Sequence, residues 1–360
     1  MKIEKIDTNF AVGEVNADGM KAYNIHTTPF KIYGLYDCKE GSYTRMPYEI
    51  AARVNDGVKW LHTNTAGGRL LFKTDSARIA LRYILPDICL LPHMPVTGVS
   101  CFDLYADGGF VKPFIPQGDF YGKAKEKGEK EFYSEVNLGS GKMRDILINF
   151  PLYNNVSAVC ILLEDGAAVL EANEYTHQKP VVFYGSSITQ GGCAGHPGNS
   201  YEAIISRKLD CDFLNLGFSG SCRGEDEMAR YIATLDMSAF VYDYDHNAPD
   251  ASWLEKTHAR FFEILRAAKP DLPVIMVSVA DKHFGEDIEK RKAVIRKTFD
   301  TAVANGDKNV YFIDGQEIYG SRADLATVDY CHPNDLGFYL MAEKIGEVIT
   351  DILKGMQNEI

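Results

Sequence analysis

A short apolar run that ends in a glycine and two serines constrains the fold of this 360-residue chain more than any other stretch. Residues 181–184 (Val-Val-Phe-Tyr) have no helical spacing and lie between Pro180 and Gly185. Such a run is typical of a buried strand of a parallel sheet, which is covered on both faces. Ser187 follows at the carboxyl end of this strand, where open α/β sheets bind their ligands. On this evidence alone, Ser187 is either a nucleophile or a turn-forming hydroxyl.

The second half of the chain alternates between strand-like and helical patterns. Strands are expected at residues 181–184, 213–216, 240–244, 274–279 and 310–313. Helices are expected at residues 201–209, 225–235, 253–268, 286–304 and about 334–354. This alternation predicts a mainly parallel, five-stranded sheet in a three-layer α/β/α sandwich, and we expect this domain to span residues 178–360.

The first half is dominated by short segments that are rich in β-branched and aromatic residues. Strands are expected at residues 58–63, 69–74, 77–83, 102–105, 131–136, 143–149 and 159–163. Many short strands at such intervals predict an all-β antiparallel sandwich or jelly roll. The polar segment from Glu171 to Pro180 is the expected linker, so this domain is predicted to span residues 1–172.

Composition and charge argue against several classes of partner. The net charge of −12 and the pI near 5.3 argue against binding to nucleic acid or to an anionic membrane. The first residues lack the apolar core of a secretory signal, and the longest apolar run is too short to span a bilayer. We therefore expect a cytoplasmic protein without a membrane partner, whose oligomeric state the sequence leaves open.

The cysteines and histidines show no local metal-binding pattern. The eight cysteines include no C-x-x-C pair, and the nine histidines include no H-x-x-x-H pair. In a chain of this length without an export signal, reduced thiols are the expected state. Three of them, Cys193, Cys222 and Cys331, lie near motif positions and are expected to be packing thiols. Neither a metal nor an organic cofactor is expected.

Four short motifs follow predicted strands or precede a predicted helix. They contribute Ser187, Gly220 in residues 215–221, Asn247 in residues 242–247, and the pair Asp329 and His332 in residues 329–333. Because the carboxyl ends of parallel strands share one edge, we expect these residues to meet there. Taken singly, each motif is also compatible with a capping or turn role. Their order on one scaffold favours catalysis.

Together these residues supply what acyl transfer from an ester requires. A serine hydroxyl needs a base to remove its proton, and His332 is the candidate base for Ser187. Asp329 lies three residues earlier and is placed to accept the other imidazole N–H. The tetrahedral intermediate needs oxyanion donors, for which the backbone N–H groups of Ser187 and Gly220 and the side-chain amide of Asn247 are the candidates.

The four motifs resemble, in order, the blocks of the SGNH (GDSL-type) esterases and lipases. The resemblance covers Pro180 to about Lys354 and implies a flavodoxin-like catalytic domain with Ser187, Asp329 and His332 as its triad. Two departures concern neighbouring positions. Ser186 occupies the place of the usual aspartate or asparagine, and residues 245–249 (Asp-His-Asn-Ala-Pro) replace the usual G-x-N-D block.

The first half carries a second resemblance. Residues 101–105 (Cys-Phe-Asp-Leu-Tyr) resemble the G-x-D-L-Y signature of the β-rich domain that precedes some SGNH esterases, with Cys101 in place of the glycine. The two-domain layout is similar to that of carbohydrate acetylesterases of carbohydrate esterase family 2. One acyltransferase of natural-product biosynthesis has a similar arrangement.

The resulting hypothesis is a serine esterase that removes a small acyl group, expected to be acetyl, from a carbohydrate. Its partner would be a small-molecule or oligosaccharide ester. His246, Arg223 and His93 are candidate substrate contacts, the last within a proline-containing loop at residues 90–95 that is either a rigid lid or an inert connection. Two alternatives stay open: an acyltransferase with the same triad and an alcohol acceptor, or a carbohydrate-binding protein without catalysis.

Overall fold

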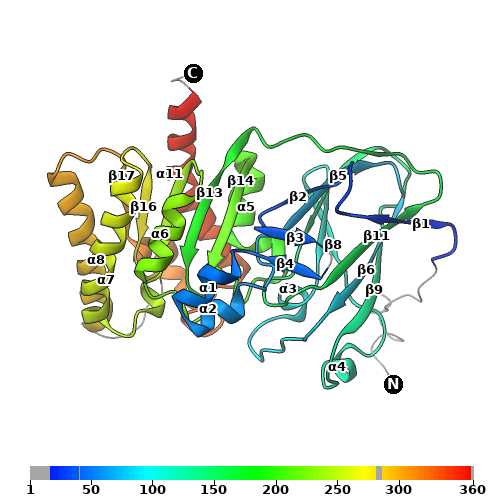
Figure 1. The fold of residues 1–360 in the computed structure, drawn as a ribbon, viewed down its shortest axis with the longest axis horizontal. Coiled ribbons are helices and arrows are strands. Elements are labelled where there is room, and N and C mark those ends of the chain that lie inside the picture. The colour runs from blue at the N-terminus through cyan, green and yellow to red at the C-terminus, as the bar shows by residue number, and fades with distance from the viewer. Residues whose placement is uncertain (1–16, 40, 281–285, 358–360) are drawn as a thin grey trace.

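The computed structural model describes residues 17–39, 41–280 and 286–357 and contains one parallel sheet and separate antiparallel sheets (Figure 1). The parallel sheet has five strands in the order β14-β13-β15-β16-β17. Its strands are β13 (His177–Gly185), β14 (Cys211–Gly217), β15 (Ala239–Asp243), β16 (Val274–Val277) and β17 (Val310–Ile313). The five strands predicted for the second half are thereby confirmed. The expected linker is shorter than predicted, because β13 already begins at His177.

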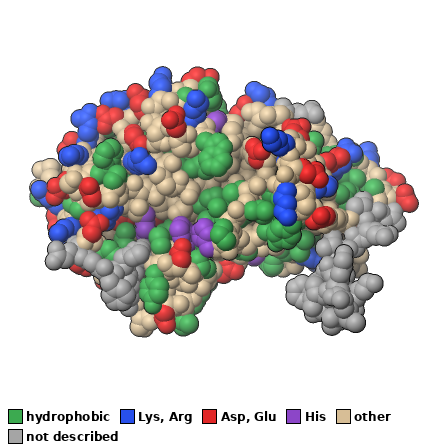
Figure 2. All heavy atoms as spheres, turned by 90° about the horizontal axis from the view of Figure 1, so that it is seen from below, with side chains coloured by type: hydrophobic (Ala, Val, Ile, Leu, Met, Phe, Trp, Pro, Cys, Tyr) green, Lys and Arg blue, Asp and Glu red, His purple; other side chains and the backbone are tan. Residues whose placement is uncertain are grey.

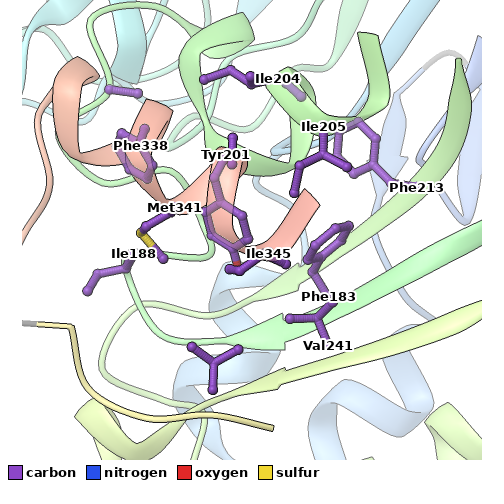
Figure 3. Close-up of a cluster of buried hydrophobic side chains, with 14 of the residues drawn as sticks. Phe183, Ile188, Tyr201, Ile204, Ile205, Phe213, Val241, Phe338, Met341 and Ile345 are labelled. Carbon is purple, nitrogen blue, oxygen red and sulfur yellow. The ribbon is translucent and has the colours of Figure 1, made fainter. Parts of the chain in front are cut away.

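Side chains of the parallel sheet alternate between two cores, as the pleat requires. In β13, Val181 and Phe183 belong to one buried cluster, whereas Val182 and Tyr184 belong to the other. Figure 3 shows part of the first cluster, in which Phe183 lies near Tyr201 and Ile345. The helices over this face are α5 (Tyr201–Leu209), α9 (Gly315–Tyr319), α10 (Ala323–Ala326) and α11 (Asp335–Gln357).

The opposite face of the sheet is covered by a second set of helices. These are α6 (Asp226–Thr234), α7 (Ala251–Ala268) and α8 (Glu286–Ala304). The three-layer α/β/α architecture is therefore confirmed. Burying one large apolar side chain stabilises a fold by roughly 1.5–3 kcal/mol. Each of the two cores contains many such side chains, so their burial stabilises the central sheet on both faces.

The first half forms two antiparallel sheets around a third core. One has the order β1-β11-β6-β9, and the other has the order β12-β5-β10-β7-β8 with β2 paired to β5. The strands are β1 (Met20–Asn24), β2 (Lys31–Tyr33), β5 (Arg69–Thr74), β6 (Arg78–Leu85), β7 (Asp103–Ala106), β8 (Gly109–Pro113), β9 (Lys130–Asn137), β10 (Arg144–Asn149), β11 (Ala158–Glu164) and β12 (Val169–Leu170). The core between them is rich in aromatic residues, including Phe72, Tyr83 and Phe102.

Six of the seven strands predicted for the first half are confirmed. Its remaining elements are the hairpin of β3 (Asp37–Lys39) and β4 (Ser42–Thr44), and the short helices α3 (Val96–Val99) and α4 (Phe120–Lys123). Jelly-roll connectivity and the domain limits at residues 172 and 178 stay predictions, and residues 1–16 and 358–360 of the predicted domains lie outside the described ranges.

The strand predicted at residues 58–63 is wrong, because this segment forms helix α2 (Asp56–Leu61) directly after α1 (Tyr48–Val54). The side chain of Asn55 accepts a hydrogen bond of 2.9 Å from the backbone N–H of Val58 and so caps α2. Val58 and Leu61 are buried in the core beside α6. Both helices therefore extend the first half onto the parallel sheet, where Figure 1 shows them next to the lower ends of β13 and β14.

Among the described residues, no helix combines the length and the apolar character needed to cross a lipid bilayer.

Candidate active site

The carboxyl edge of the parallel sheet brings the four sequence motifs together. Ser187 lies just beyond the end of β13, and Gly220 lies beyond the end of β14. Asn247 ends the short 3-10 helix η4 (Asp245–Asn247) after β15, and His332 lies in the loop before α11. Figure 2 views the molecule from below Figure 1 and shows histidine side chains gathered at the surface on this side.

The turn that carries Ser187 requires close approach of backbone to backbone. A Cβ atom at Gly185 would lie only 2.2 Å from the backbone oxygen of Asp243, and one at Gly217 would lie 2.3 Å from the backbone nitrogen of Gln190. Larger residues at these two positions would force the strands away from the turn. Within the turn, the backbone N–H of Gly192 donates a hydrogen bond of 2.8 Å to the backbone oxygen of Ser187.

Ser187, His332 and Asp329 form one continuous hydrogen-bonded chain. The Oγ atom of Ser187 lies 2.8 Å from Nε2 of His332, and Nδ1 of the same ring lies 2.8 Å from Oδ2 of Asp329. The other carboxylate oxygen of Asp329 accepts a hydrogen bond of 2.7 Å from the backbone N–H of His332. The ring is therefore held by its partner carboxylate with Nε2 directed at the serine.

Asp329 is deprotonated, as its role of hydrogen-bond acceptor for His332 requires. Partial burial on its own raises the pKa of the carboxyl, but the hydrogen bonds from the backbone N–H and imidazole of His332 outweigh it. The pKa of Asp329 therefore lies below its ordinary value, and the group is a carboxylate at neutral pH. A carboxylate accepts from Nδ1–H and leaves the lone pair of Nε2 facing Ser187.

The three candidate oxyanion donors have distinct surroundings. Among the described residues, the backbone N–H groups of Ser187 and Gly220 donate to no protein acceptor. The Oδ1 atom of Asn247 accepts a hydrogen bond of 3.2 Å from the backbone N–H of Cys222. This bond fixes the side-chain amide, so that its donor atom Nδ2 points away from Cys222. Gly220 has a φ of +66°, a left-handed conformation that favours glycine. Their action on an oxyanion stays a prediction.

The first half of the chain supports the serine turn directly. The hydroxyl of Tyr153 donates a hydrogen bond of 3.0 Å to the backbone oxygen of Ser187. The side-chain amide of Gln190, three residues beyond the serine, donates to Oδ1 of Asn64 at 3.0 Å and to the backbone oxygen of Leu152 at 3.2 Å. Residues from both halves therefore set the position of the nucleophile candidate.

Asp103 of the G-x-D-L-Y-like segment fastens the loop that follows this turn. Its Oδ2 atom accepts hydrogen bonds of 2.6 Å each from Nδ1 of His196 and from the backbone N–H of Gly198. Its Oδ1 atom accepts a third, also of 2.6 Å, from Nδ2 of Asn149. Because Asp103 is fully buried, these bonds replace the water that a carboxylate would otherwise need.

A buried arginine ties the first half to the second motif. Arg45, 3% exposed, donates hydrogen bonds to the backbone oxygens of Gly217 at 2.5 Å, of Asn215 at 3.2 Å and of Leu61 at 2.8 Å. Its guanidinium also lies over the ring of Phe218, 4.4 Å from the centroid. Burial lowers the pKa of Arg45 to about 10, so it remains charged at neutral pH. No short motif in the sequence marks Arg45 or Tyr153 as contributors.

The three predicted substrate contacts occupy different places around the site. His93 is exposed, and its ring centroid lies 5.4 Å from that of His332. Arg223 is exposed and donates a weak hydrogen bond of 3.4 Å to the backbone oxygen of Gly220. His246 instead lies beside buried carboxylates, with Nδ1 at 3.4 Å from Oδ1 of Asp245. Their contact with substrate stays a prediction.

Within the described ranges, two groups of side chains have the composition of metal ligands. One consists of His93, Cys193 and His332, and the other of Asp243, Asp245 and His246. In the second group, burial and the neighbouring charge of Asp245 raise the pKa of Asp243 to about 7. Asp243 is therefore partly protonated at neutral pH.

Comparison with known families agrees with this geometry. Residues 178–350 match the family model described as the GDSL-like lipase/acylhydrolase family. The chain carries a GDSL-like lipase/acylhydrolase domain. Residues 20–169 match the model described as the N-terminus of Esterase_SGNH_hydro-type. These matches confirm both resemblances inferred from the sequence and support an ester hydrolase with a GDSL-type domain. No curated protein matches the chain.

Solved structures of similar fold cover most of this chain, including its GDSL-type domain. A putative GDSL-like lipase from Bacteroides ovatus is 28% identical, with a TM-score of 0.81 over 93% of this chain and 98% of its own. The salicylyl-acyltransferase of a tetracycline biosynthetic pathway is 20% identical, with a TM-score of 0.72 over 91% and 96%. A family two carbohydrate esterase from Clostridium thermocellum, solved with cellohexaose, is 15% identical, with a TM-score of 0.55 over 81% and 94%.

Proposed function

We propose that this protein is a serine esterase that hydrolyses a small acyl ester, with acetyl as the acyl group and a carbohydrate as the alcohol. The observation that carries the proposal is the hydrogen bond of 2.8 Å between Oγ of Ser187 and Nε2 of His332. A hydroxyl this close to an imidazole whose other nitrogen faces a carboxylate has a base positioned to remove its proton.

In the proposed cycle, Oγ of Ser187 attacks the ester carbonyl while Nε2 of His332 takes the hydroxyl proton. Asp329 holds Nδ1–H and stabilises the imidazolium that forms. The backbone N–H groups of Ser187 and Gly220 and the amide of Asn247 donate to the oxyanion. His332 then gives its proton to the departing alcohol. A water molecule, deprotonated by the same ring, cleaves the acyl-serine and regenerates the hydroxyl.

The restricted surroundings of Ser187 support a small acyl group. Ser187 is 8% exposed, and the buried side chains of Met94 and Tyr153 lie against the same turn. A Cβ atom at Gly192 would lie 2.9 Å from the hydroxyl of Tyr153 and 3.1 Å from Cε of Met94. The low exposure of Ser187 suits an acetyl group better than a long acyl chain.

The carbohydrate part of the proposal has fold-level support. The carbohydrate esterase with bound cellohexaose shares the arrangement of both halves of this chain. The acyltransferase alternative has greater fold similarity behind it, because the salicylyl-acyltransferase has the higher TM-score, 0.72 against 0.55. We favour hydrolysis because water needs no binding site of its own, whereas an alcohol acceptor does. The intact hydrogen-bonded chain from Ser187 to Asp329 argues against a binding protein without catalysis.

The test compares wild type, Ser187→Ala and Ser186→Ala on the 4-nitrophenyl esters of acetate, butyrate and octanoate. Ser186 is the matched control, because it is an adjacent buried serine whose Oγ accepts a hydrogen bond of 3.2 Å from the backbone N–H of Ile188. We expect wild type and Ser186→Ala to release acetate at similar rates. The rate of Ser187→Ala should be at least about a thousandfold lower. In the two active proteins, turnover should become slower as the acyl chain lengthens.

Acetylated oligosaccharides with and without added alcohols then separate the two reactions. Hydrolysis yields free acetate, whereas transfer yields a new ester. Preference for octanoate would contradict the small acyl group. Turnover that survives in Ser187→Ala would contradict the proposed nucleophile. If an added alcohol gave mainly a new ester, the protein would be an acyltransferase and not a hydrolase.

A further inference from the structure

Three side chains at the catalytic edge, far apart in the sequence, bring metal-ligating atoms together. A ring nitrogen of His93, the Sγ atom of Cys193 and a ring nitrogen of His332 all lie within 4.8 Å of one another. His93 belongs to the loop before α3, Cys193 to the loop after β13, and His332 to the loop before α11. Because no two of them are close in sequence, no local motif could reveal the group.

The ligand chemistry of this group is that of zinc. One thiolate and two imidazoles suit Zn²⁺, which binds sulfur and nitrogen ligands in a tetrahedron and accepts water as the fourth. Zinc bonds of about 2.0–2.3 Å place ligand atoms about 3.5 Å apart, so no two ligand atoms need to approach each other by more than about 1.3 Å. His93 is exposed, which leaves its ring room to turn toward the other two.

His332 is held in place by bonds already described, and Cys193 lies in a constrained turn. Oδ2 of Asp329 lies 2.8 Å from Nδ1 of His332, and a carboxylate in this position orients a histidine for zinc through Nε2 just as it does for a serine. Cys193 is 4% exposed and has a φ of +73°, a conformation that the surrounding turn must impose on a non-glycine residue. The turn therefore fixes the backbone of Cys193, and the Sγ atom lies within 4.8 Å of a ring nitrogen of His332.

We propose that His93, Cys193 and His332 form a zinc-binding site through which Zn²⁺ reversibly inhibits the esterase. Binding forms bonds from the metal to Sγ of Cys193 and to one nitrogen of each imidazole. The thiol proton passes to solvent, and the hydrogen bond between Ser187 and His332 breaks. The lone pair of Nε2 then binds the metal and is no longer available to deprotonate Ser187. This inhibition rests on the proposed function, whereas the metal site itself does not.

The test measures zinc binding separately from turnover. Wild type, Cys193→Ala, His93→Ala and Cys38→Ala are freed of metal and titrated with Zn²⁺ by calorimetry. Binding of Cd²⁺ is followed in parallel through the ultraviolet absorption of the cadmium–thiolate bond. Cys38 is the matched control, because its Sγ atom also faces a histidine, at 3.9 Å from Nδ1 of His26, but lies in the first half of the chain.

We expect Cys193→Ala and His93→Ala each to lose at least about tenfold in zinc affinity, because each removes one direct ligand of three. The cadmium–thiolate absorption of the site should disappear in Cys193→Ala and persist in Cys38→Ala. In ester hydrolysis, each protein is compared with its own metal-free rate. Zinc should inhibit wild type and Cys38→Ala with the affinity found by calorimetry, and a chelator should restore the rate.

Equal zinc affinity in wild type and Cys193→Ala would overturn the site, whether or not the protein hydrolyses esters. Binding that depends on Cys193 without inhibition would overturn the regulatory role. Metal-free wild type that turns over no ester would contradict the proposed function instead, and the calorimetric result for the metal site would still stand.

Discussion

The hydroxyl of Tyr153 donates a hydrogen bond of 3.0 Å to the backbone oxygen of Ser187. The donor belongs to the first half of the chain and the acceptor to the turn that carries the proposed nucleophile. Burial raises the pKa of Tyr153, so the phenol stays protonated and remains a donor at any pH at which the protein is studied. The antiparallel half therefore helps to position the serine.

We predict that Tyr153→Phe lowers kcat on the order of fivefold with little change in KM, because about 1 kcal/mol of positioning is lost in the transition state. The free energy of unfolding should fall by only about 1 kcal/mol, since the backbone N–H of Gly192 still donates to the oxygen of Ser187. The check is steady-state kinetics of ester hydrolysis together with urea unfolding.

The matched control is Tyr133→Phe, which removes a hydroxyl that lies 3.3 Å from Oε2 of Glu135 on β9. Its kinetics should equal those of wild type. Equal kcat values for the two variants would show that the Tyr153 hydroxyl does not position Ser187.

The sequence predicted the second half closely because its strands are buried on both faces. Short continuous apolar runs such as residues 181–184 are typical of parallel strands that are covered on both faces. Two of its helices, α5 (Tyr201–Leu209) and α8 (Glu286–Ala304), match the expected limits residue for residue. Strands, helices and their order together specify one sheet edge, which is why Ser187 and His332 could be predicted to meet.

What the sequence did not predict depends on one local cap and on contacts between distant segments. Residues 58–63 contain β-branched and aromatic side chains, but the Asn55 cap and the burial of Val58 and Leu61 beside α6 select a helix. Tertiary packing overrides local propensity there. Likewise, the hydrogen bond from Tyr153 to Ser187 joins two residues that are 34 positions apart in the sequence. No periodicity or short motif encodes such a bond.

Arg45→Met should destabilise the protein by about 3–5 kcal/mol, because it removes a buried charge and leaves several backbone carbonyl oxygens without their donor. Those oxygens belong to Asn215, Gly217 and Leu61, so the second motif should also lose its support. Urea unfolding measures the loss. The control is Arg82→Met, since Arg82 is exposed and lies 3.4 Å from exposed Glu131. That change should cost less than about 0.5 kcal/mol; a similar cost for both arginines would contradict the role of Arg45.

Asn247→Ala and Gly220→Ala test the oxyanion donors separately. Asn247→Ala removes a side-chain donor and should lower kcat by about 10²–10³-fold. Gly220→Ala keeps the backbone N–H, and no atom lies within 4 Å of the added Cβ, so it should cost only about 1–2 kcal/mol of stability for the φ of +66°. Its kcat should fall far less. A larger kcat loss in Gly220→Ala than in Asn247→Ala would contradict this assignment.

Glu202→Gln should stabilise the protein at alkaline pH and leave its stability at acidic pH nearly unchanged. Glu202 is fully buried in α5, and burial, with the charge of Asp243 adding to it, raises the pKa of its carboxyl well above the ordinary value of 4.5. The folded state therefore holds this proton more tightly than the unfolded state does. As a result, the stability that the protonated group contributes is fully present below pH 4.5 and is lost progressively as the pH rises above it.

For one such group, the loss reaches at most about 1.4 kcal/mol per pH unit. Glutamine has the shape of the protonated acid and does not titrate, so this part of the pH dependence should vanish in Glu202→Gln. Urea unfolding at pH values from 4 to 9 provides the measurement, with Glu347→Gln as the control because Glu347 is an exposed residue of α11. The control should follow the wild-type curve. A wild-type slope that persists in Glu202→Gln would mean that another buried acid, for which Asp243 with its pKa of about 7 is the first candidate, dominates the alkaline loss of stability.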